Sequence, residues 1–533
     1  MDLFKRHGET HFANLKYGYY VFAVSILYIL VLVLLRKLMP TRNTSRSPKR
    51  SRLIRSIYGI SPLYHLPAVI ILLLIPFYHH YSLLHQASVY LKRLGRLSYV
   101  LVSLNLFITI RPNVLLPGYN YLEFIPLHKW LSRFITIVSM AHGIGFLVKW
   151  SLDPKVSLFA KSIKKTRNFV GLILFGILSL LIIVSLKPIR RYRYKWVYSI
   201  HNVAAWSMCF LTAIHARPGV TIPYLLINIA LLSIHMISSI AFARRAGVLA
   251  KAADYTKTDL VHISLPRASM PDTFIPGSHL RISPYRKINP LYWILPSHPY
   301  TVASLPQDPV VDLIIREHKY KFKLEIGCEY TVVNSYNSIP RELIESSTRV
   351  ALVCGGSGIS FALPLFKHLA SHTTDSRIRY LKLVWLVRDK SDLHVLEHCS
   401  DFQLPASSTF EIFVTKTVPE DDVTQGYSMV ASGNRFDDAE LELEFMGDVG
   451  DADELDENGA LVQNKGKSLL SKHVSSIHYG RRLDWFTDLS QFVESQELDT
   501  TWLVTCGPEG LVQAGKQYAF DNKIKLASEV YAL

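Results

Sequence analysis

Long apolar runs dominate the first half of the chain, up to about residue 245. A run of about 20 mostly apolar residues is long enough to cross a bilayer as a helix. The pattern therefore predicts a multi-pass α-helical membrane domain with about seven spans. The predicted spans are 17–38, 62–80, 97–117, 128–149, 169–187, 197–216 and 221–243.

The pattern changes after about residue 250. Short alternating runs such as LVHISL, HLRIS and VVDLIIRE, separated by proline and polar turns, predict a small antiparallel β-barrel. From residue 349, fully apolar strands alternate with helical segments, which predicts a parallel α/β sheet with crossover helices. The predicted domains are N-terminal spans at 1–96, a second membrane domain at 97–245, the barrel at 250–345 and the α/β domain at 346–533.

Four histidines stand inside the predicted spans as two pairs, and each pair is 14 positions apart. They are His128 and His142 in one span, and His201 and His215 in another. Fourteen residues make nearly four helical turns and climb roughly 21 Å, so both members of a pair lie on one face, one in each leaflet. Two such helices side by side provide two stacked bis-imidazole sites, which suit two haem irons. A single intramembrane histidine is better explained as a core residue, and His235 receives no role.

Charge is distributed unevenly over the 533 residues, whose net charge is +17. The stretch 36–55 carries eight Lys or Arg, and the positive-inside rule explains this better than a nucleic-acid-binding arm. This loop is predicted to be cytoplasmic and to contact anionic lipid; a basic loop at 150–168 conflicts with the resulting topology. Residues 420–457 hold 14 of the 42 acidic residues and one basic residue, and this composition predicts a disordered insert.

A glycine-rich turn follows the first strand of the predicted α/β domain. Gly355, Gly356 and Gly358 lie between an apolar strand and a helix, where backbone can approach a dinucleotide closely. Cys506 and Gly507 end a later strand in an equivalent position. A tight turn without a ligand explains the first motif alone equally well, but the recurrence favours nucleotide binding. The five cysteines are scattered without a CxxC motif, which suits a reducing compartment.

These motifs together resemble the ferric reductase and NADPH oxidase superfamily of flavocytochromes, and within it most of all the fungal metalloreductases. The resemblance is carried by the histidine spacing, by HPYTVAS at 298–304, VCGGSGIS at 353–360, VWLVRD at 384–389 and TCGPEG at 505–510. It covers roughly residues 90–533. It implies a bis-haem membrane domain followed by a cytosolic module like ferredoxin reductase, with an FAD-binding barrel and an NAD(P)H-binding domain.

The resemblance also implies site residues. The FAD site is expected at His298, Pro299, Tyr300, Thr301, Ser304 and Arg316. The NADPH site is expected at Gly355, Gly356, Gly358, Arg388, Arg481, Cys506 and Gly507. Thr301 and Ser304 are expected near the flavin ring, and His298 and Arg316 near the FAD phosphates. Arg388 and Arg481 are the candidates for the 2′-phosphate that distinguishes NADPH from NADH. Arg96 and Arg111 are candidates for haem propionates, or are anchors at the membrane edge.

The chain departs from the family pattern in three places. Asn334-Ser335-Tyr336-Asn337 stands where the family has a glycine-containing turn that contacts the adenine side of FAD. The chain ends Tyr531-Ala532-Leu533 instead of in the aromatic residue that usually covers the flavin, and Tyr531 is the nearest substitute. The acidic insert interrupts the dinucleotide domain; it is either regulatory or, as we favour, a tolerated insertion.

The family implies electron transfer from cytosolic NADPH through FAD and two b-type haems to an acceptor across the membrane. The favoured acceptor is Fe³⁺ or Cu²⁺ in a metalloreductase, and the alternative is O₂ in a superoxide-producing oxidase. His79, His80 and His85 are candidates for brief metal binding on the outer side. A haem-free, non-catalytic membrane protein is the third hypothesis. The expected location is the plasma membrane or the endoplasmic reticulum, with no nucleic-acid partner.

Overall fold

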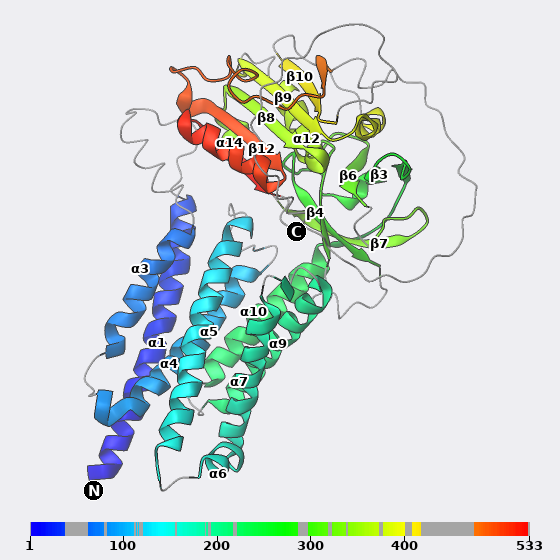
Figure 1. Ribbon diagram of the computed structural model, residues 1–533. Coiled ribbons are helices and arrows are strands. Elements are labelled where there is room, and N and C mark those ends of the chain that lie inside the picture. Colours follow the sequence, from blue (N-terminus) through cyan, green and yellow to red (C-terminus); the bar gives the residue numbers. More distant parts are fainter. Residues whose placement is uncertain are drawn as a thin grey trace. The chain divides into compact units, whose positions relative to one another are not determined.

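The computed structural model forms two compact units (Figure 1). The first unit contains Met1–Arg190, Tyr194–Ala243 and Ile288–Pro296, and the second contains Arg191–Arg193, Arg244–Lys287 and Ser297–Leu533. The structure describes residues 2–37, 62–78, 83–110, 113, 116, 121–154, 157–186, 188–189, 193–216, 221–285, 297–317, 322–336, 339–371, 377–399, 408–416 and 474–530. The basic loop 38–55, the acidic insert 420–457, Arg111, His79, His80 and the chain end 531–533 lie outside them.

The first unit is a bundle of helices that run alongside one another (Figure 1). Each of the seven predicted spans corresponds to a helix. These helices are α1 (Asp2–Lys37), α3 (Pro62–Leu74), α4 (Leu83–Thr109), α5 (Tyr121–Ser151), α7 (Thr166–Val184), α9 (Tyr194–His215) and α10 (Thr221–Ala241). A short helix, α6 (Leu158–Ile163), precedes α7.

Among the described residues, five helices are long and apolar enough to cross a membrane, namely α1, α5, α7, α9 and α10. The predicted second span is a helix of only 13 residues, α3, which continues into a 3₁₀ turn at Ile75–Tyr78. The predicted third span, 97–117, has the wrong bounds. Helix α4 begins 14 residues earlier, at Leu83, with non-helical backbone at Gln86, and it ends at Thr109.

Apolar side chains cover both the inside and the outside of this bundle. Val21, Leu101 and Leu127 are completely buried in a core shared by α1, α4 and α5. Ile137 on α5 and Ile237 on α10 are 67% and 61% exposed. A helix that is apolar all round needs an apolar surrounding on its outer face as well, and a bilayer provides one. The bundle is therefore built as a membrane domain.

The second unit begins with two antiparallel sheets that enclose one apolar core. The strand order is β1-β7-β4-β5 in the four-stranded sheet and β2-β3-β6 in the three-stranded sheet. Ile263, Leu280, Leu313 and Val332 are fully buried between them. This arrangement confirms the predicted antiparallel barrel. The strands are β1 (Ala243–Gly247), β2 (Ala250–Ala253), β3 (Leu260–Pro266), β4 (His279–Pro284), β5 (His298–Thr301), β6 (Val310–Arg316) and β7 (Glu329–Tyr336).

A six-stranded parallel sheet follows, with strand order β11-β10-β9-β8-β12-β13. Alternate residues of β8 enter different cores, since Leu352 packs on one face of the sheet and Val353 on the other. Burial on both faces explains why these strands are continuously apolar in sequence. The strands are β8 (Arg349–Gly355), β9 (Tyr380–Val387), β10 (Ser408–Val414), β11 (Ser476–Tyr479), β12 (Thr501–Gly507) and β13 (Lys525–Val530), and the main helices are α12 (Ile359–Ser371) and α14 (Glu509–Asp521).

The chain runs from β8 to β9 on one side, and β12 lies on the other side of β8. The strand order therefore reverses between β8 and β12, which pair with each other in parallel. Open α/β sheets bind their ligands at such a point, beyond the carboxyl ends of the strands.

Candidate functional site

The four paired histidines meet as two pairs between α5 and α9. The ring centres of His128 and His201 lie 6.2 Å apart, and those of His142 and His215 lie 5.9 Å apart. The earlier histidine of α5 meets the earlier histidine of α9, and the later one meets the later one, so the two helices run in the same direction. We call His128 and His201 the first layer, and His142 and His215 the second layer. The layers are roughly 21 Å apart along the helices.

Both rings of the second layer are held by main-chain carbonyl groups. Nδ1 of His142 lies 2.7 Å from the carbonyl oxygen of Leu91 on α4, and Nδ1 of His215 lies 2.8 Å from that of Arg167 on α7. A carbonyl oxygen only accepts, so Nδ1 carries the proton in both rings. The lone pair is then on Nε2, the nitrogen that remains for a metal.

In the first layer a side chain takes the place of the carbonyl. Nδ1 of His128 lies 3.0 Å from Oδ1 of Asn105, and Nδ2 of Asn105 donates to Ser132 at 3.0 Å. With Oδ1 of the amide facing the ring, that oxygen accepts from the Nδ1–H of His128. Nε2 of His128 is again the nitrogen available as a ligand.

This geometry fits haem iron better than a bare metal ion. Two imidazoles that share one metal, each with a bond of about 2 Å, have ring centres about 6 Å apart. The two measured separations match that value. No group of three or more His, Cys, Asp or Glu suited to a metal ion occurs in the described part of the chain. Each layer thus offers two ligands, which is the number that an iron already held by a porphyrin accepts.

Of the two arginines predicted to contact haem propionates, Arg96 lies within the described residues and Arg111 does not. Arg96 is half-buried on α4, next to Gly95, and a methyl group on Gly18 of α1 would lie 3.8 Å from its Cδ. This position is compatible with the predicted role. The side chain of His85, like His79, His80 and Arg111, is outside the described set.

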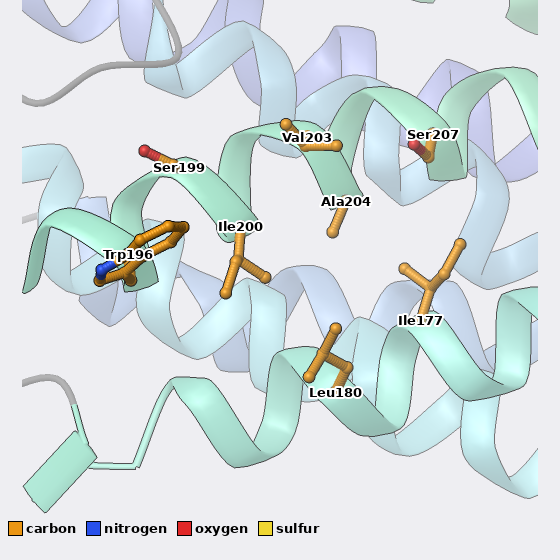
Figure 2. A pocket seen from close by; sticks show the side chains of 8 residues that line it. All are labelled: Ile177, Leu180, Trp196, Ser199, Ile200, Val203, Ala204 and Ser207. Atoms are coloured by element: carbon orange, nitrogen blue, oxygen red, sulfur yellow. The ribbon is translucent and has the colours of Figure 1, made fainter. Parts of the chain in front are cut away.

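A cavity of about 410 Å³ lies between α7 and α9 (Figure 2). Its lining is apolar except for Ser199 and Ser207, and it contains no charged side chain. Figure 2 shows Ile177 and Leu180 of α7 opposite Ile200 of α9. The cavity has no group suited to a metal ion or a phosphate, and it is separate from the histidine layers in its lining residues.

The residues predicted to bind FAD lie on β5, just after β5, and at the end of β6. The ring of His298 stacks on Phe322, with centres 4.4 Å apart and planes 8° apart. Thr301 ends β5 and is buried. Arg316 ends β6 and is exposed. A methyl group on Gly356 would lie 3.3 Å from its Nη2, so the guanidinium is beside the glycine-rich turn.

Ser304 already has an internal partner. Its hydroxyl accepts a hydrogen bond from the backbone N–H of Asp312 at 3.1 Å and is almost completely buried. The carboxylate of Asp312 accepts from Ser264 at 2.8 Å and lies 3.3 Å from Nε2 of His262. This buried network on β3 and β6 was not predicted from the sequence. It fixes the backbone directly after the HPYT strand.

The two glycine turns of the predicted NADPH site meet at the switch point. Gly358 faces the carbonyl oxygen of Cys506, and a methyl group at residue 358 would lie 2.8 Å from it. Gly507 has φ +144° and approaches the backbone of Gly355. Gly356 has φ +54°, and its carbonyl accepts from the indole of Trp385 at 2.8 Å. Only glycines allow such close contact between the two turns.

Cys354 and Cys506 are partners in the register of β8 and β12, and both are buried. Burial raises the pKa of the Cys354 thiol well above its ordinary value because a thiolate there would lose its hydration. Cys354 is therefore an unreactive thiol that contributes to packing. Cys506 and Gly507 are the last two residues of β12, in agreement with their predicted place at the end of a strand.

Three basic residues follow the carboxyl ends of three neighbouring parallel strands. Arg388 follows β9, Lys416 follows β10, and Arg481 follows β11. Lys416 pairs with Asp389 at 2.9 Å and holds the pKa of that carboxyl below its ordinary value. Arg481 pairs with Asp488 at 2.5 Å. Lys416 was not identified from the sequence, because its place depends on the pairing of β9 with β10.

Three protein-family models match the chain in the order of its domains. "Ferric reductase like transmembrane component" matches residues 94–212. "FAD-binding domain" matches residues 245–342, and "Ferric reductase NAD binding domain" matches 347–520. These matches confirm the predicted order of a membrane domain, an FAD-binding domain and a nucleotide-binding domain. They cover both turns of the nucleotide site and all the histidines of the first layer.

Solved structures with detectable similarity include a ferredoxin–NADP⁺ reductase from Plasmodium falciparum. It is 11% identical and covers 54% of this chain and 96% of its own, with a TM-score of 0.33. A flavohaemoglobin from Malassezia yamatoensis is 12% identical, covers 84% and 97%, and has a TM-score of 0.34.

Similarity to yeast proteins is much stronger. "Probable metalloreductase AIM14" of Lachancea thermotolerans is 50% identical over the whole of both chains. The proteins of the same name from Zygosaccharomyces rouxii and Kluyveromyces lactis are each 47% identical, over 100% and 99% of this chain and 99% of their own length. Identity at this level over complete chains shows that this chain belongs to the fungal ferric reductase family together with these relatives.

Proposed function

We propose that this protein is an NADPH-dependent metalloreductase that transfers electrons across a membrane to Fe³⁺ or Cu²⁺. The observation that carries the proposal is the pair of histidine layers on parallel helices α5 and α9, in a chain that continues into FAD- and NAD-binding domains. Two histidine layers that are separated along the helices support the passage of electrons through the bilayer. A protein that only bound a metal ion would require a single histidine layer.

When bound, FAD and two b-type haems supply the conversion of a two-electron hydride transfer into single-electron steps. The residues of this chain hold and orient these groups. His128, His142, His201 and His215 would hold the haem irons, with Nε2 as the free ring nitrogen of His128, His142 and His215. The bonds at Nδ1 keep three of these rings in the ligating tautomer, which reduces the rearrangement required when the iron is bound.

At the nucleotide end, the two glycine turns admit a dinucleotide backbone between β8 and β12. Arg388, Lys416 and Arg481 would bind the 2′-phosphate, since charged donors at adjacent strand ends suit a phosphate group. Arg316 lies beside Gly356 and connects the barrel to this turn. It is therefore positioned to contact phosphate groups of FAD, of NADPH, or of both.

The metal ion as acceptor is supported by the names of the yeast relatives, which are probable metalloreductases. The proposed location is the plasma membrane or the endoplasmic reticulum, with the FAD and NADPH half in the cytosol. A superoxide-producing oxidase remains the second candidate, because the same cofactor chain would serve O₂. The two differ only at the acceptor side of the second layer.

The test is to supply NADPH to the purified full-length protein in lipid vesicles and to measure Fe³⁺ reduction and superoxide output separately. Superoxide dismutase is added in a parallel reaction. A metalloreductase continues to reduce Fe³⁺ when superoxide dismutase removes superoxide. Reduction that stops on addition of superoxide dismutase would identify an oxidase whose product reduces iron in solution.

A further inference from the structure

Each of the two histidines of the second layer is held by a main-chain carbonyl, and the two carbonyls belong to different helices. His142 donates to the carbonyl of Leu91 on α4, and Gly95 lies four residues after Leu91. His215 donates to the carbonyl of Arg167 on α7, and Gly171 lies four residues after Arg167. In both helices, therefore, a glycine lies four residues after the residue whose carbonyl accepts from the histidine.

Helix geometry explains why a glycine is needed at that spacing. In an α-helix the carbonyl of residue i accepts from the N–H of residue i+4. The Cα–Cβ bond of residue i+4 tilts toward the helix N-terminus and so leans back toward that carbonyl. A side chain at i+4 would stand where an imidazole must approach to share the carbonyl. Glycine leaves that approach open.

The distances agree with this explanation. A methyl group on Gly95 would lie 2.8 Å from Cε1 and 2.9 Å from Nδ1 of His142. A methyl group on Gly171 would lie 2.5 Å and 2.6 Å from the same atoms of His215. Contacts this short do not occur, so either ring would have to move. The ring is fixed on one side by the hydrogen bond from Nδ1 to the carbonyl oxygen. Movement of the ring would therefore break that hydrogen bond or displace Nε2.

We propose that Gly95 and Gly171 are positioning residues for His142 and His215, the two histidines that would hold one haem. Each exposes the carbonyl one turn earlier, and this carbonyl fixes the tautomer and direction of its histidine. The inference rests on the proposed function, because it concerns ligands of the second-layer haem. It does not extend to the first layer, in which His128 uses the side chain of Asn105 and not a main-chain carbonyl.

Gly176 provides a matched control within the same helix as Gly171. Nothing lies within 4 Å of a methyl group placed on Gly176. Alanine is a better helix former than glycine, so all three Gly→Ala changes favour the helix itself. Any loss at residues 95 and 171 that is absent at residue 176 must come from the contact with the histidine.

The experiment uses the full-length protein purified with its cofactors. Gly95→Ala, Gly171→Ala and Gly176→Ala are compared with the wild type by haem-to-FAD ratio, by electron paramagnetic resonance of the ferric state and by redox titration. We expect Gly95→Ala and Gly171→Ala each to lose one of two low-spin haems, or to convert it to high spin. The other haem keeps its midpoint potential, and Gly176→Ala keeps both haems.

Two unaltered low-spin haems with wild-type potentials in both variants would overturn the inference while leaving the proposed function intact. A wild-type protein without haem would instead overturn both. Should Gly95→Ala fail to accumulate, the double variant Gly95→Ala/His142→Ala decides. If the glycine acts through the ring, the double variant accumulates to the level of His142→Ala. Accumulation as poor as that of Gly95→Ala would show a role in helix packing only.

Discussion

The ring centres of His142 and His215 lie 5.9 Å apart, and their planes are 85° apart. The two residues are 73 positions apart in the sequence and come from helices that run in the same direction. Each ring also donates to a carbonyl of a third or fourth helix, α4 or α7. The second layer is therefore assembled from four helices, and its geometry depends on how all of them pack.

Removal of one second-layer ligand should separate the two halves of the electron path. We expect His142→Ala to abolish reduction of an external acceptor and to leave reduction of FAD by NADPH unchanged, since the nucleotide site is in the other unit. Rapid-mixing spectroscopy measures flavin bleaching, and ferrozine measures Fe²⁺. His235→Ala, a histidine of α10 outside both layers, serves as the control and should retain both activities. Normal external reduction in His142→Ala would refute an electron path that passes through the second layer.

Cofactor preference should depend on the basic residues at the carboxyl ends of β9, β10 and β11. A charge-assisted hydrogen bond contributes about 1.5–3 kcal/mol, so Arg388→Gln should lower the kcat/KM preference for NADPH over NADH by roughly 10- to 100-fold. Arg388 should have the largest effect, because Lys416 and Arg481 share their charge with Asp389 and Asp488.

The matched control for this prediction is Arg379→Gln. Arg379 directly precedes β9, at the opposite edge of the sheet, where it pairs with Glu497. Its removal should leave the preference for NADPH unchanged. Equal effects at residues 379 and 388 would mean that net charge, and not a phosphate site, determines the preference.

Contact between the glycine turns should be necessary for binding of NADPH. Gly358→Ala places a methyl group 2.8 Å from the carbonyl oxygen of Cys506 and must separate the turns. We expect the KM for NADPH to rise about tenfold, equivalent to about 1.4 kcal/mol, with FAD content unchanged. Gly510→Ala in α14 meets nothing within 4 Å and should behave like the wild type. Steady-state kinetics with saturating acceptor measure both variants.

The acidic insert should be dispensable for the redox reaction. β10 ends at Val414 and β11 begins at Ser476, and the two strands pair in parallel. A parallel crossover needs a dozen or more residues, and deletion of 420–457 leaves more than that. The deletion should retain FAD and its reduction by NADPH. Complete loss of flavin reduction in a soluble, FAD-containing preparation would show that the insert has a structural role.

Histidine pairing was predictable from the 14-residue spacing, and the strands of the α/β sheet were predictable from their short, continuously apolar runs. The bounds of α4 were not. Its basic residues interrupt the apolar pattern, yet Arg93 is buried, donates to the carbonyl of Pro76 at 3.3 Å and lies over the rings of Tyr17 and Tyr90. These tertiary contacts satisfy the charge and allow the helix to continue.

Residues that act through the backbone or through strand register also escape sequence analysis. The carbonyls of Leu91 and Arg167 belong to residues whose side chains give no indication of a role. Lys416 joins Arg388 only because β10 pairs with β9. Such groups become recognisable once the positions of neighbouring elements are known.

The central claim is that the four histidines bind two haems, and the haem content of the purified protein tests it most directly. The measurement is haem b per FAD by the pyridine haemochrome method, together with electron paramagnetic resonance of the ferric state. The account predicts two haems per FAD, both low-spin with two imidazole ligands. A protein with FAD but with no haem, or with only one, would contradict it.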